Sequence, residues 1–285
     1  MSMTPDSSLD HRNGYDPRFV GARVDLPTAT VADDAVLVNG SPAVHYTRFS
    51  LGLSKTRKLC RWVAWNIDGS TLPKPNSPDA IGREDLEFTI DPRIDPGLQT
   101  NNKVYKKNRL DRGHIARRAD LLWGPHDEAV LANQDSFYLT NITPQMDNFN
   151  QSALHGVWGR LENALLDHVD EDDARISVMA GPVLADSDQP YRNVLVPREF
   201  WKLLIYRSDN ELRTRGFIVS QSLDGLKERD PFAEFVVAER TVEQIADQAK
   251  VTFDAALSEA QFRGRRRTRG RVEPRIISNE AQIEW

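Results

Sequence analysis

The sequence has a single cysteine and no long apolar run, and these two absences exclude several classes of protein. Cys60 has no second cysteine for an internal disulfide, and one thiol cannot build a thiolate metal cluster. No apolar stretch approaches the length of a membrane-spanning helix, and residues 1–8 lack the cationic and apolar regions of a secretory leader. We therefore expect a buried Cys60 in a soluble protein that is cytoplasmic by default and has no membrane partner. Export without a leader and residence in an organelle are the alternatives.

Composition and local pattern divide the chain into three parts. Residues 1–43 are rich in proline, aspartate, glycine and serine and show little periodicity, which predicts an irregular N-terminal arm. Residues 44–262 carry the periodic apolar pattern of a single folded domain. Residues 263–285 form an arginine-rich C-terminal tail. With 285 residues, 39% of them apolar, the chain can bury a substantial core.

The net charge of -5 hides two concentrations of positive charge. Residues 103–118 hold seven lysines and arginines and one acid, and residues 263–275 hold seven arginines and one acid. The rest of the chain carries 23 basic and 40 acidic residues. Positive charge gathered in two places on an acidic body is typical of a local polyanion site, with a solvated face as the alternative for each run. For the tail, a second nucleic-acid contact and a docking peptide both stay open.

Strand and helix patterns are mixed without a regular βαβ alternation. Period-two patterns predict strands over residues 44–53, 59–67, 136–142, 176–180, 200–206 and 215–220. Apolar residues at three- and four-residue spacing predict a helix over 150–169, and a shorter helix is expected over 127–134. Thr241 and Gln244 fit a capping box that opens a helix to about Lys250. These elements predict an α+β fold with a central antiparallel sheet flanked by helices.

The most distinctive stretch is Asp111-Arg112-Gly113-His114, in the first basic run. A carboxylate beside a histidine can hold the imidazole in one tautomer as a general base, and guanidinium groups match the geometry of phosphate oxygens. The combination indicates attack on a phosphodiester. Four residues alone also fit an ordinary solvated turn with a surface histidine.

Three features follow one another along the chain. They are the Asp111–His114 motif, the segment Thr140-Asn141-Ile142-Thr143-Pro144-Gln145, and Asn148-Phe149-Asn150-Gln151 before a helix with Arg160-Leu161-Glu162. In this order they closely resemble the DNA/RNA non-specific endonucleases, ββα-metal nucleases that include mitochondrial endonuclease G and bacterial sugar-non-specific nucleases. The resemblance covers roughly residues 44–257 and includes the Gly82-Arg83 loop before Asp91-Pro92 and the segment 196–202. It implies the ββα-metal fold and a metal-dependent nuclease.

The resemblance assigns roles to individual residues. His114 matches the general base, and an ordinary imidazole pKa near ~6.5 suits proton abstraction at neutral pH. Asn150 matches the one direct metal ligand, and Glu162 matches a carboxylate that holds metal-bound water. An amide oxygen surrounded by waters suits Mg²⁺ or Mn²⁺ and not Zn²⁺. Arg83 matches an arginine used on the phosphate, with Arg112 assisting it, and fixed positive charge would stabilise the transition state.

Other matches are supporting residues. Asn141 matches an asparagine that supports the site, and Asp111 is expected to brace the loop, with a purely structural turn as the alternative for both. Leu166 stands where the family often has an arginine, so a phosphate contact is missing or supplied elsewhere. For nucleic-acid contacts we expect Lys106, Lys107, Arg117, Arg118 and Arg160.

One spacing departs from the family pattern. The metal asparagine and the glutamate lie about two helical turns apart in the family, whereas Asn150 and Glu162 are twelve residues apart, more than three turns. Gly156 indicates that residues 151–156 form an inserted loop and that the regular helix begins near Val157. His155 lies in this insert and is either an exposed histidine or a neighbour of the metal.

These observations predict a metal-dependent endonuclease that cuts DNA, and also RNA, with little sequence preference and leaves 5′-phosphate ends. A nuclease fold without activity, serving as a nucleic-acid-binding or regulatory module, is one alternative, and a phosphodiesterase for smaller nucleotides is another. Because an uncontrolled nuclease would damage its host, we expect an inhibitor or regulatory protein as a partner. The resemblance alone implies a homodimer.

Overall fold

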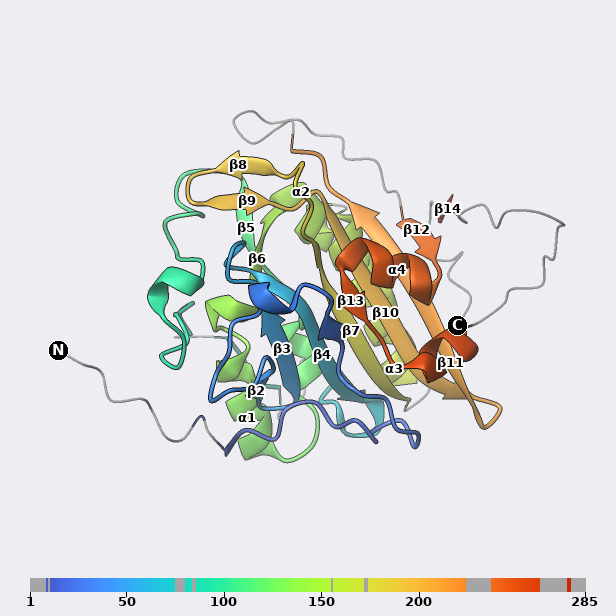
Figure 1. Cartoon of the computed structure of the whole chain (residues 1–285). Helices are drawn as coiled ribbons and strands as arrows, with labels where there is room; N and C mark the ends of the chain where they lie inside the picture. The colour runs from blue at the N-terminus through green and yellow to red at the C-terminus, as the bar shows by residue number, and fades with distance from the viewer. Residues whose placement is uncertain are drawn as a thin grey trace, which may run out of the picture.

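The computed structural model of the chain describes residues 9, 11–74, 80–83, 86–154, 156–171, 174–223, 237–261 and 276–277. Within these residues, an antiparallel sheet of eight strands forms the centre, in the order β14-β12-β11-β10-β7-β4-β3-β2 (Figure 1). The strands are β2 (Val44–Tyr46), β3 (Phe49–Leu53), β4 (Cys60–Asp68), β7 (Arg175–Val183), β10 (Glu199–Ser208), β11 (Glu211–Ser220), β12 (Val237–Arg240) and β14 (Ile276–Ile277).

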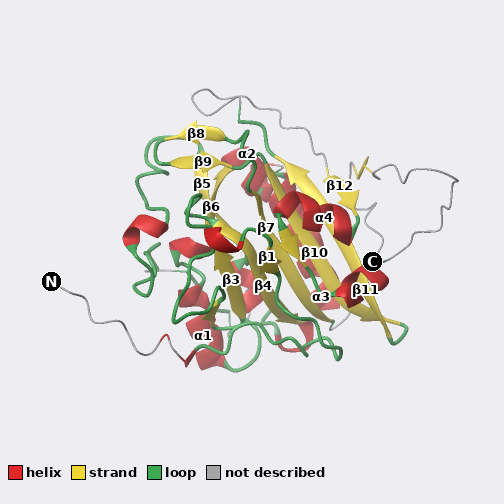
Figure 2. Ribbon diagram, viewed as in Figure 1, coloured by secondary structure: helices red, strands yellow, loops and turns green. Residues whose placement is uncertain are grey.

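Smaller elements surround this sheet (Figure 2). The described residues also form two-stranded sheets from β1 (Thr28–Ala29) with β13 (Val251–Thr252), β5 (Leu110–His114) with β6 (Ile142–Met146), and β8 (Gln189–Tyr191) with β9 (Val194–Val196). The helices are α1 (His126–Asp135), α2 (Asp147–Asn150), α3 (Val157–Glu171), α4 (Val242–Ala249) and α5 (Ala255–Glu259).

The large sheet is covered on both faces, and successive side chains of each strand point to opposite faces. On β10, Phe200 and Leu204 pack in one apolar cluster, while Trp201, Leu203 and Ile205 pack in another. The first cluster includes residues of α3 and of the β5–β6 hairpin, and we call it the α3 side. The second includes residues of α4 and of the N-terminal arm, and we call it the α4 side. In Figure 1, α4 lies in front of the sheet and α3 behind it.

The predicted α+β class is confirmed, with helices flanking a central antiparallel sheet. The predicted helices over 127–134 and from Thr241 are present as α1 and α4, and the capping box at Thr241 has both of its hydrogen bonds. Lys250 ends α4 in the left-handed conformation. Cys60 is fully buried, as expected.

Four predicted strand boundaries are wrong, including that of β11, which begins at Glu211 rather than at Arg215. Residues 44–53 form two strands rather than one, because the chain turns at Thr47, whose backbone N–H and hydroxyl donate to buried Asp135. Residues 136–141 are not a strand; a turn at residues 136–137 is followed by a short 3₁₀ helix over Leu139–Asn141, and β6 begins only at Ile142 and runs through Pro144. A proline is tolerated there because each strand of a two-stranded sheet has an unpaired edge. Strand β7 continues past Ala180 through Gly181-Pro182 to Val183.

The N-terminal arm lacks long regular elements but contributes to the core. Tyr15, Phe19 and Val24 are buried in the apolar cluster of the α4 side. Of the tail, the structure describes Ile276 and Ile277, which pair with β12. No helix among the described residues is long and apolar enough to cross a membrane.

Candidate active site

The Asp111–His114 motif lies on β5, which pairs antiparallel with β6, and α2 follows β6 directly. The motif is therefore part of a β-β-α unit and not a solvated turn. A Cβ atom on Gly113 would lie 2.0 Å from Oε1 of Gln145, so a glycine is needed where this side chain crosses the strand. Strand alternation places Arg112 and His114 on one side of β5, and Asp111 and Gly113 on the other.

The His114 ring is half-buried beside two aromatic rings. Its centroid lies 5.5 Å from that of Phe88 and 5.4 Å from that of Phe137. Nε2 is enclosed and has no hydrogen-bond partner among the described residues. Burial, together with the positive charges of Arg118 and Arg83, lowers the pKa of His114 to about 3, well below the ordinary value expected from the sequence. The ring is thus neutral at neutral pH, as a general base must be.

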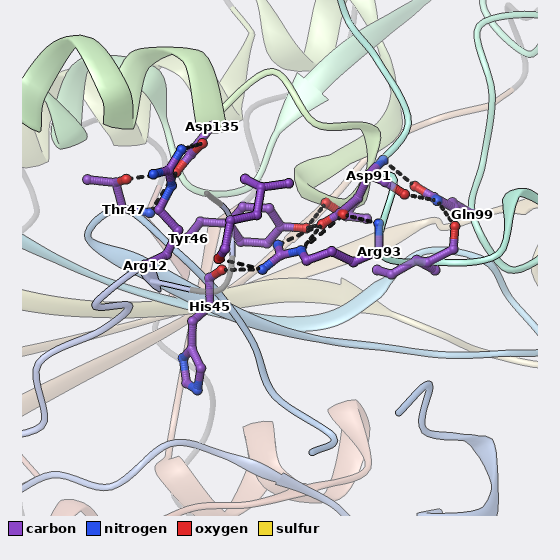
Figure 3. Close-up of polar contacts among 11 residues, drawn as sticks. Arg12, His45, Tyr46, Thr47, Asp91, Arg93, Gln99 and Asp135 are labelled. Atoms are coloured by element: carbon purple, nitrogen blue, oxygen red, sulfur yellow. Dashed lines mark hydrogen bonds and ion pairs between the residues drawn. The ribbon is translucent and has the colours of Figure 1, made fainter. Parts of the chain in front are cut away.

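A buried polar network links Tyr46, Asp91 and Arg93 (Figure 3). The Tyr46 hydroxyl donates to Asp91 (2.5 Å) and shares a hydrogen bond with Thr140 (2.7 Å), the neighbour of Asn141. The Arg93 guanidinium donates to Asp91 and to the carbonyl oxygens of Leu9 and His45. The network therefore joins the arm, strand β2 and the loop that carries Phe88.

Arg83 lies in an exposed loop that Arg118 and Asn133 hold in place. Arg118 donates to the carbonyl oxygen of Ile81 (2.9 Å) and to the side chain of Asn133 (3.2 Å). Asn133 in turn donates to the carbonyl oxygen of Gly82 (2.8 Å). Arg118, which was predicted to contact nucleic acid, therefore also holds the loop that carries Arg83.

Arg112 and Asn141 are both fixed by internal contacts. Arg112 donates to Asn102 (2.7 Å) and its guanidinium carbon lies 5.1 Å from the ring centroid of Tyr105. The Asn141 side chain is fully buried, accepts from the backbone N–H of Ala116 (2.9 Å) and donates to its carbonyl oxygen (3.0 Å). Asn141 therefore locks the chain two residues beyond His114.

Asn150, at the end of α2, is oriented by Asp111. Its Nδ2 donates to Asp111 Oδ2 (3.0 Å), and Gln151 Nε2 donates to the same oxygen (2.7 Å). Because the amide nitrogen is bound to a carboxylate, the amide oxygen is directed away from Asp111 and, within the described part of the chain, has no hydrogen-bond partner. Asp111 thus braces the loop, as predicted. His114 and Asn150 are linked through strand β5, and their side chains have different immediate neighbours.

The inserted loop predicted after Asn150 is present. The turn Ser152–Leu154 separates α2 from α3, which begins at Val157. A Cβ atom on Gly159 would lie 2.4 Å from the carbonyl oxygen of Asn150, so glycine lets the loop pack directly on the helix. Glu162 lies one helical turn further along α3, on the same face as Gly159. Because the regular helix begins only at Val157, Glu162 lies in its second turn. The loop, and not additional helical turns, accounts for the wide spacing between Asn150 and Glu162. His155 lies outside the described residues.

Glu162 is nearly buried in a cluster of charged side chains. Lys202 Nζ donates to Glu162 Oε1 (3.2 Å), and Arg117 Nε lies 4.0 Å from Oε2. Asp120 accepts from Trp65 Nε1 (3.1 Å), and burial raises the pKa of Asp120 to about 6. The carboxylates of Asp120 and Glu162 thus lie together with the positively charged side chains of Lys202 and Arg117.

The chemistry of these donors fits a hydrated, hard divalent cation. Among the residues that the structure describes, no three His, Cys, Asp or Glu side chains gather as metal ligands. A cation at the Asn150 oxygen would therefore keep most of its waters, which Mg²⁺ favours. The nearly buried carboxylate of Glu162 is suited to accept hydrogen bonds from such waters.

The predicted nucleic-acid contacts differ in exposure. Lys106 and Lys107 are exposed in the loop before β5, and Arg160 is half-buried at the start of α3. Arg192, from the β8–β9 turn, donates to the carbonyl oxygens of Val104 (3.1 Å) and Lys106 (2.6 Å). Arg117 donates to Asn163 (2.7 Å) on α3. The arginines of the tail, residues 263–275, lie outside the described residues.

Sequence reasoning assigned no role to three residues of this region. Asn133 and Arg192 act through backbone carbonyls, and nothing in the local sequence indicates such contacts. Lys202 did leave a signal, because it is a lysine within the apolar strand 200–206. Its partner on α3 could not be read from that pattern.

Comparison with known proteins agrees with this geometry. The chain is 35% identical over 235 residues to an uncharacterised protein of Sinorhizobium fredii, covering 76% of this chain and 34% of that protein. It is 26% identical to a nuclease of Nostoc sp. (63% of this chain, 57% of that protein). It is 25% identical to human mitochondrial endonuclease G (57% and 55%). The chain thus spans about a third to just over half the length of these curated relatives.

Structure and family comparisons point the same way. A crystal structure of the EndoG/EndoGI complex superposes with a TM-score of 0.57 at 19% identity, covering 80% of this chain and 93% of that chain, which shows a shared fold. The profile of the DNA/RNA non-specific endonucleases, a metal-dependent family, matches residues 28–260. The chain therefore belongs to the DNA/RNA non-specific endonuclease family.

Proposed function

We propose that this protein is a metal-dependent endonuclease that hydrolyses phosphodiester bonds of DNA and RNA with little sequence preference. The observation that carries the proposal is the β-β-α unit itself. One strand supplies His114 in its neutral form, and Asp111 of the same strand binds the amide nitrogen of Asn150, which leaves the amide oxygen for a cation. In this proposal the two side chains act on one scissile phosphate.

His114 takes the proton of the attacking water. The water oxygen forms a bond to phosphorus as the proton moves to the imidazole, and the bond between phosphorus and the 3′-oxygen breaks. The leaving 3′-oxygen takes up a proton from a second water. The products carry a 5′-phosphate and a 3′-hydroxyl. Because the nucleophile is water and not the ribose 2′-hydroxyl, both DNA and RNA are substrates. Arg83 and Arg112 hold positive charge near the phosphate as its negative charge increases.

Mg²⁺ is the proposed cofactor, with Mn²⁺ as a substitute. Asn150 would hold the ion directly and Glu162 would hold its waters. When bound, the ion neutralises charge on the phosphate and on the leaving oxygen.

Nucleic acid would bind through its phosphates. The exposed Lys106 and Lys107 and the half-buried Arg160 are the proposed contacts, with Arg117 and Arg118 at the inner edge. Phosphate contacts carry little sequence information and weaken as salt rises. Low sequence preference follows from this mode of binding.

Supercoiled plasmid and a long RNA, each incubated with Mg²⁺ or with EDTA, test the proposal. We expect both to be cut with Mg²⁺, to remain intact with EDTA, and to remain intact with His114→Ala. Bound but uncut nucleic acid would favour the inactive module, the alternative that the Asn150–Glu162 spacing supports. Turnover of small diesters alone would favour the phosphodiesterase.

An inhibitory protein is the proposed partner. The EndoG of the superposed structure is bound to EndoGI, in a complex described as one of EndoG inhibition. Co-purification of a protein that suppresses cutting would support a comparable partner here. The homodimer stays a prediction, and light scattering of the purified chain tests it.

A further inference from the structure

Lys202 is a fully buried lysine in an apolar row of β10. Its neighbours on the α3 side of this strand are Phe200 and Leu204, both buried. Its exposed fraction is 0%, so its ammonium group has lost contact with bulk water. Burial of a charge is costly unless specific partners compensate for it. The partners of Lys202 therefore indicate why a lysine is present.

The Glu162 carboxylate and two aromatic rings contact the ammonium group. Nζ donates to Glu162 Oε1 at 3.2 Å. It also lies 4.1 Å from the ring centroid of Trp158 and 5.7 Å from that of Trp65, as in a cation–π contact. Trp65 is itself held by its hydrogen bond to Asp120 (3.1 Å). The position of Nζ is thus fixed from the sheet and from α3 together.

This arrangement leaves the two oxygens of Glu162 in different situations. Lys202 binds Oε1, whereas Oε2 has Arg117 at 4.0 Å, beyond a normal hydrogen bond. Binding of one oxygen to an immobile donor restricts rotation of the carboxylate. Oε2 is therefore the oxygen that can receive a hydrogen bond from a hydrated cation.

We propose that Lys202 is a positioning residue for the metal site. From inside the core it orients the Glu162 carboxylate so that Oε2 receives the waters of the cation bound at Asn150. The proposal rests on the proposed function, because the metal assignments of Asn150 and Glu162 belong to it. A buried ion pair that served only stability would be replaceable by apolar side chains, since such pairs often contribute little net stability.

Binding of Mn²⁺ alone, followed by electron paramagnetic resonance, tests this without any turnover. Lys202→Met keeps most of the apolar part of the side chain and removes its charge. We expect about a tenfold weaker affinity for Mn²⁺, the effect typical of a group that orients a metal ligand. Urea unfolding of the same sample measures the loss of stability separately.

Arg57→Met is the matched control. Arg57 and Asp188 form another buried ion pair, close to the β8–β9 hairpin. We expect this variant to lose stability while its Mn²⁺ affinity stays within twofold of the wild type. If both variants weaken Mn²⁺ binding alike, general destabilisation explains the result and the proposal is wrong.

Two further variants separate failure of this inference from failure of the proposed function. Asn150→Ala and Glu162→Gln should each weaken Mn²⁺ binding, and Lys202→Met added to Glu162→Gln should cause no further loss. If neither Asn150→Ala nor Glu162→Gln has an effect, the metal site itself is misassigned. If they do but Lys202→Met binds Mn²⁺ as the wild type does, only the role of Lys202 is overturned.

Lys202→Arg is the second variant should Lys202→Met not fold. It keeps the charge but moves the donors, so a positioning role predicts weaker Mn²⁺ binding in a folded protein. Wild-type affinity in Lys202→Arg would contradict the proposal.

Discussion

Two buried carboxylates, those of Asp34 and Asp120, have opposite surroundings. Asp34 accepts hydrogen bonds from Ser54, from the backbone and hydroxyl of Thr56, and from Arg61. Burial alone would raise the pKa of Asp34, but these donors outweigh it and the pKa is lowered. Asp120 accepts from Trp65, its Oδ1 has no partner among the described residues, and burial raises its pKa to about 6.

The polar groups around Asp34 stabilise the fold, whereas those around Asp120 lie next to the candidate active site. Both carboxylate oxygens of Asp34 accept hydrogen bonds, and its ion pair with Arg61 lies at the end of the β3–β4 hairpin. The other region brings together Asp120, Glu162, Lys202 and Arg117, and two of its buried polar atoms, Asp120 Oδ1 and Arg117 Nη1, have no hydrogen-bond partner in the part of the chain that the structure describes. Buried polar atoms without hydrogen-bond partners are tolerated at functional sites, whereas elsewhere they lower the stability of the fold.

The largest expected difference between the two regions is in activity. His114→Ala should lower kcat by about 10²- to 10⁴-fold, because it removes the proton acceptor. Its urea midpoint should stay close to that of the wild type. His126→Ala, in the exposed first turn of α1, is the control and should cut plasmid normally. Equal activity of both variants would exclude His114 as the base.

The sequence predicted the elements that local chemistry determines. The period of α3 and the capping box of α4 gave correct helices, and Gly156 indicated the insert. Residues 136–141 were mistaken for a strand because buried aromatic residues look alike in a strand and in a turn packed under a loop. The lowered pKa of His114 and the bond between Lys202 and Glu162 depend on tertiary contacts, so no local pattern could indicate them.

Substitution of Asp34 tests how much the paired charges around it stabilise the fold. Asp34→Asn leaves Arg61 as a buried charge without its counter-ion and should lower the free energy of unfolding by about 3–5 kcal/mol at pH 7.5. Urea denaturation followed by tryptophan fluorescence measures this. A loss below the error of the method would mean that the donors around Asp34 do not stabilise the fold.

Asp120→Asn should raise the free energy of unfolding, whereas Asp34→Asn should lower it. Because the folded protein raises the pKa of Asp120, the ionised carboxylate costs stability as pH rises through about 6. Removing the charge should increase the free energy of unfolding by about 1–2 kcal/mol at pH 7.5 and by only about a third as much at pH 4.5, where the folded carboxyl is still protonated. Destabilisation at both pH values would show that the Asp120 charge is fully compensated.

The pH profile of cutting should reflect the low pKa of His114. A base with an ordinary pKa near ~6.5 would lose about tenfold in kcat/KM by pH 5.5, as protonation removes the neutral form. Since the pKa of His114 is lowered to about 3, kcat/KM at saturating Mg²⁺ should stay nearly flat down to pH 5. An acidic limb centred near pH 6.5 would show that substrate and metal restore the ordinary pKa.

The smallest expected effect concerns the exposed lysines. Lys106→Ala should weaken DNA binding a few-fold and reduce the salt dependence of affinity by about one unit of slope, because one phosphate contact is lost. Arg23→Ala, in the arm, is the control and should leave both quantities unchanged. Fluorescence anisotropy with a labelled duplex across a salt series measures them.

Nuclear magnetic resonance of the histidine side chains in the presence of Mn²⁺ tests most directly whether His114 and Asn150 serve one site. In protein labelled at its histidines, with the His114 signal assigned from His114→Ala, a paramagnetic ion held by Asn150 should broaden that signal first. The same titration of Asn150→Ala should leave it sharp. A His114 signal that stays sharp while other histidines broaden would place the cation elsewhere and contradict the account.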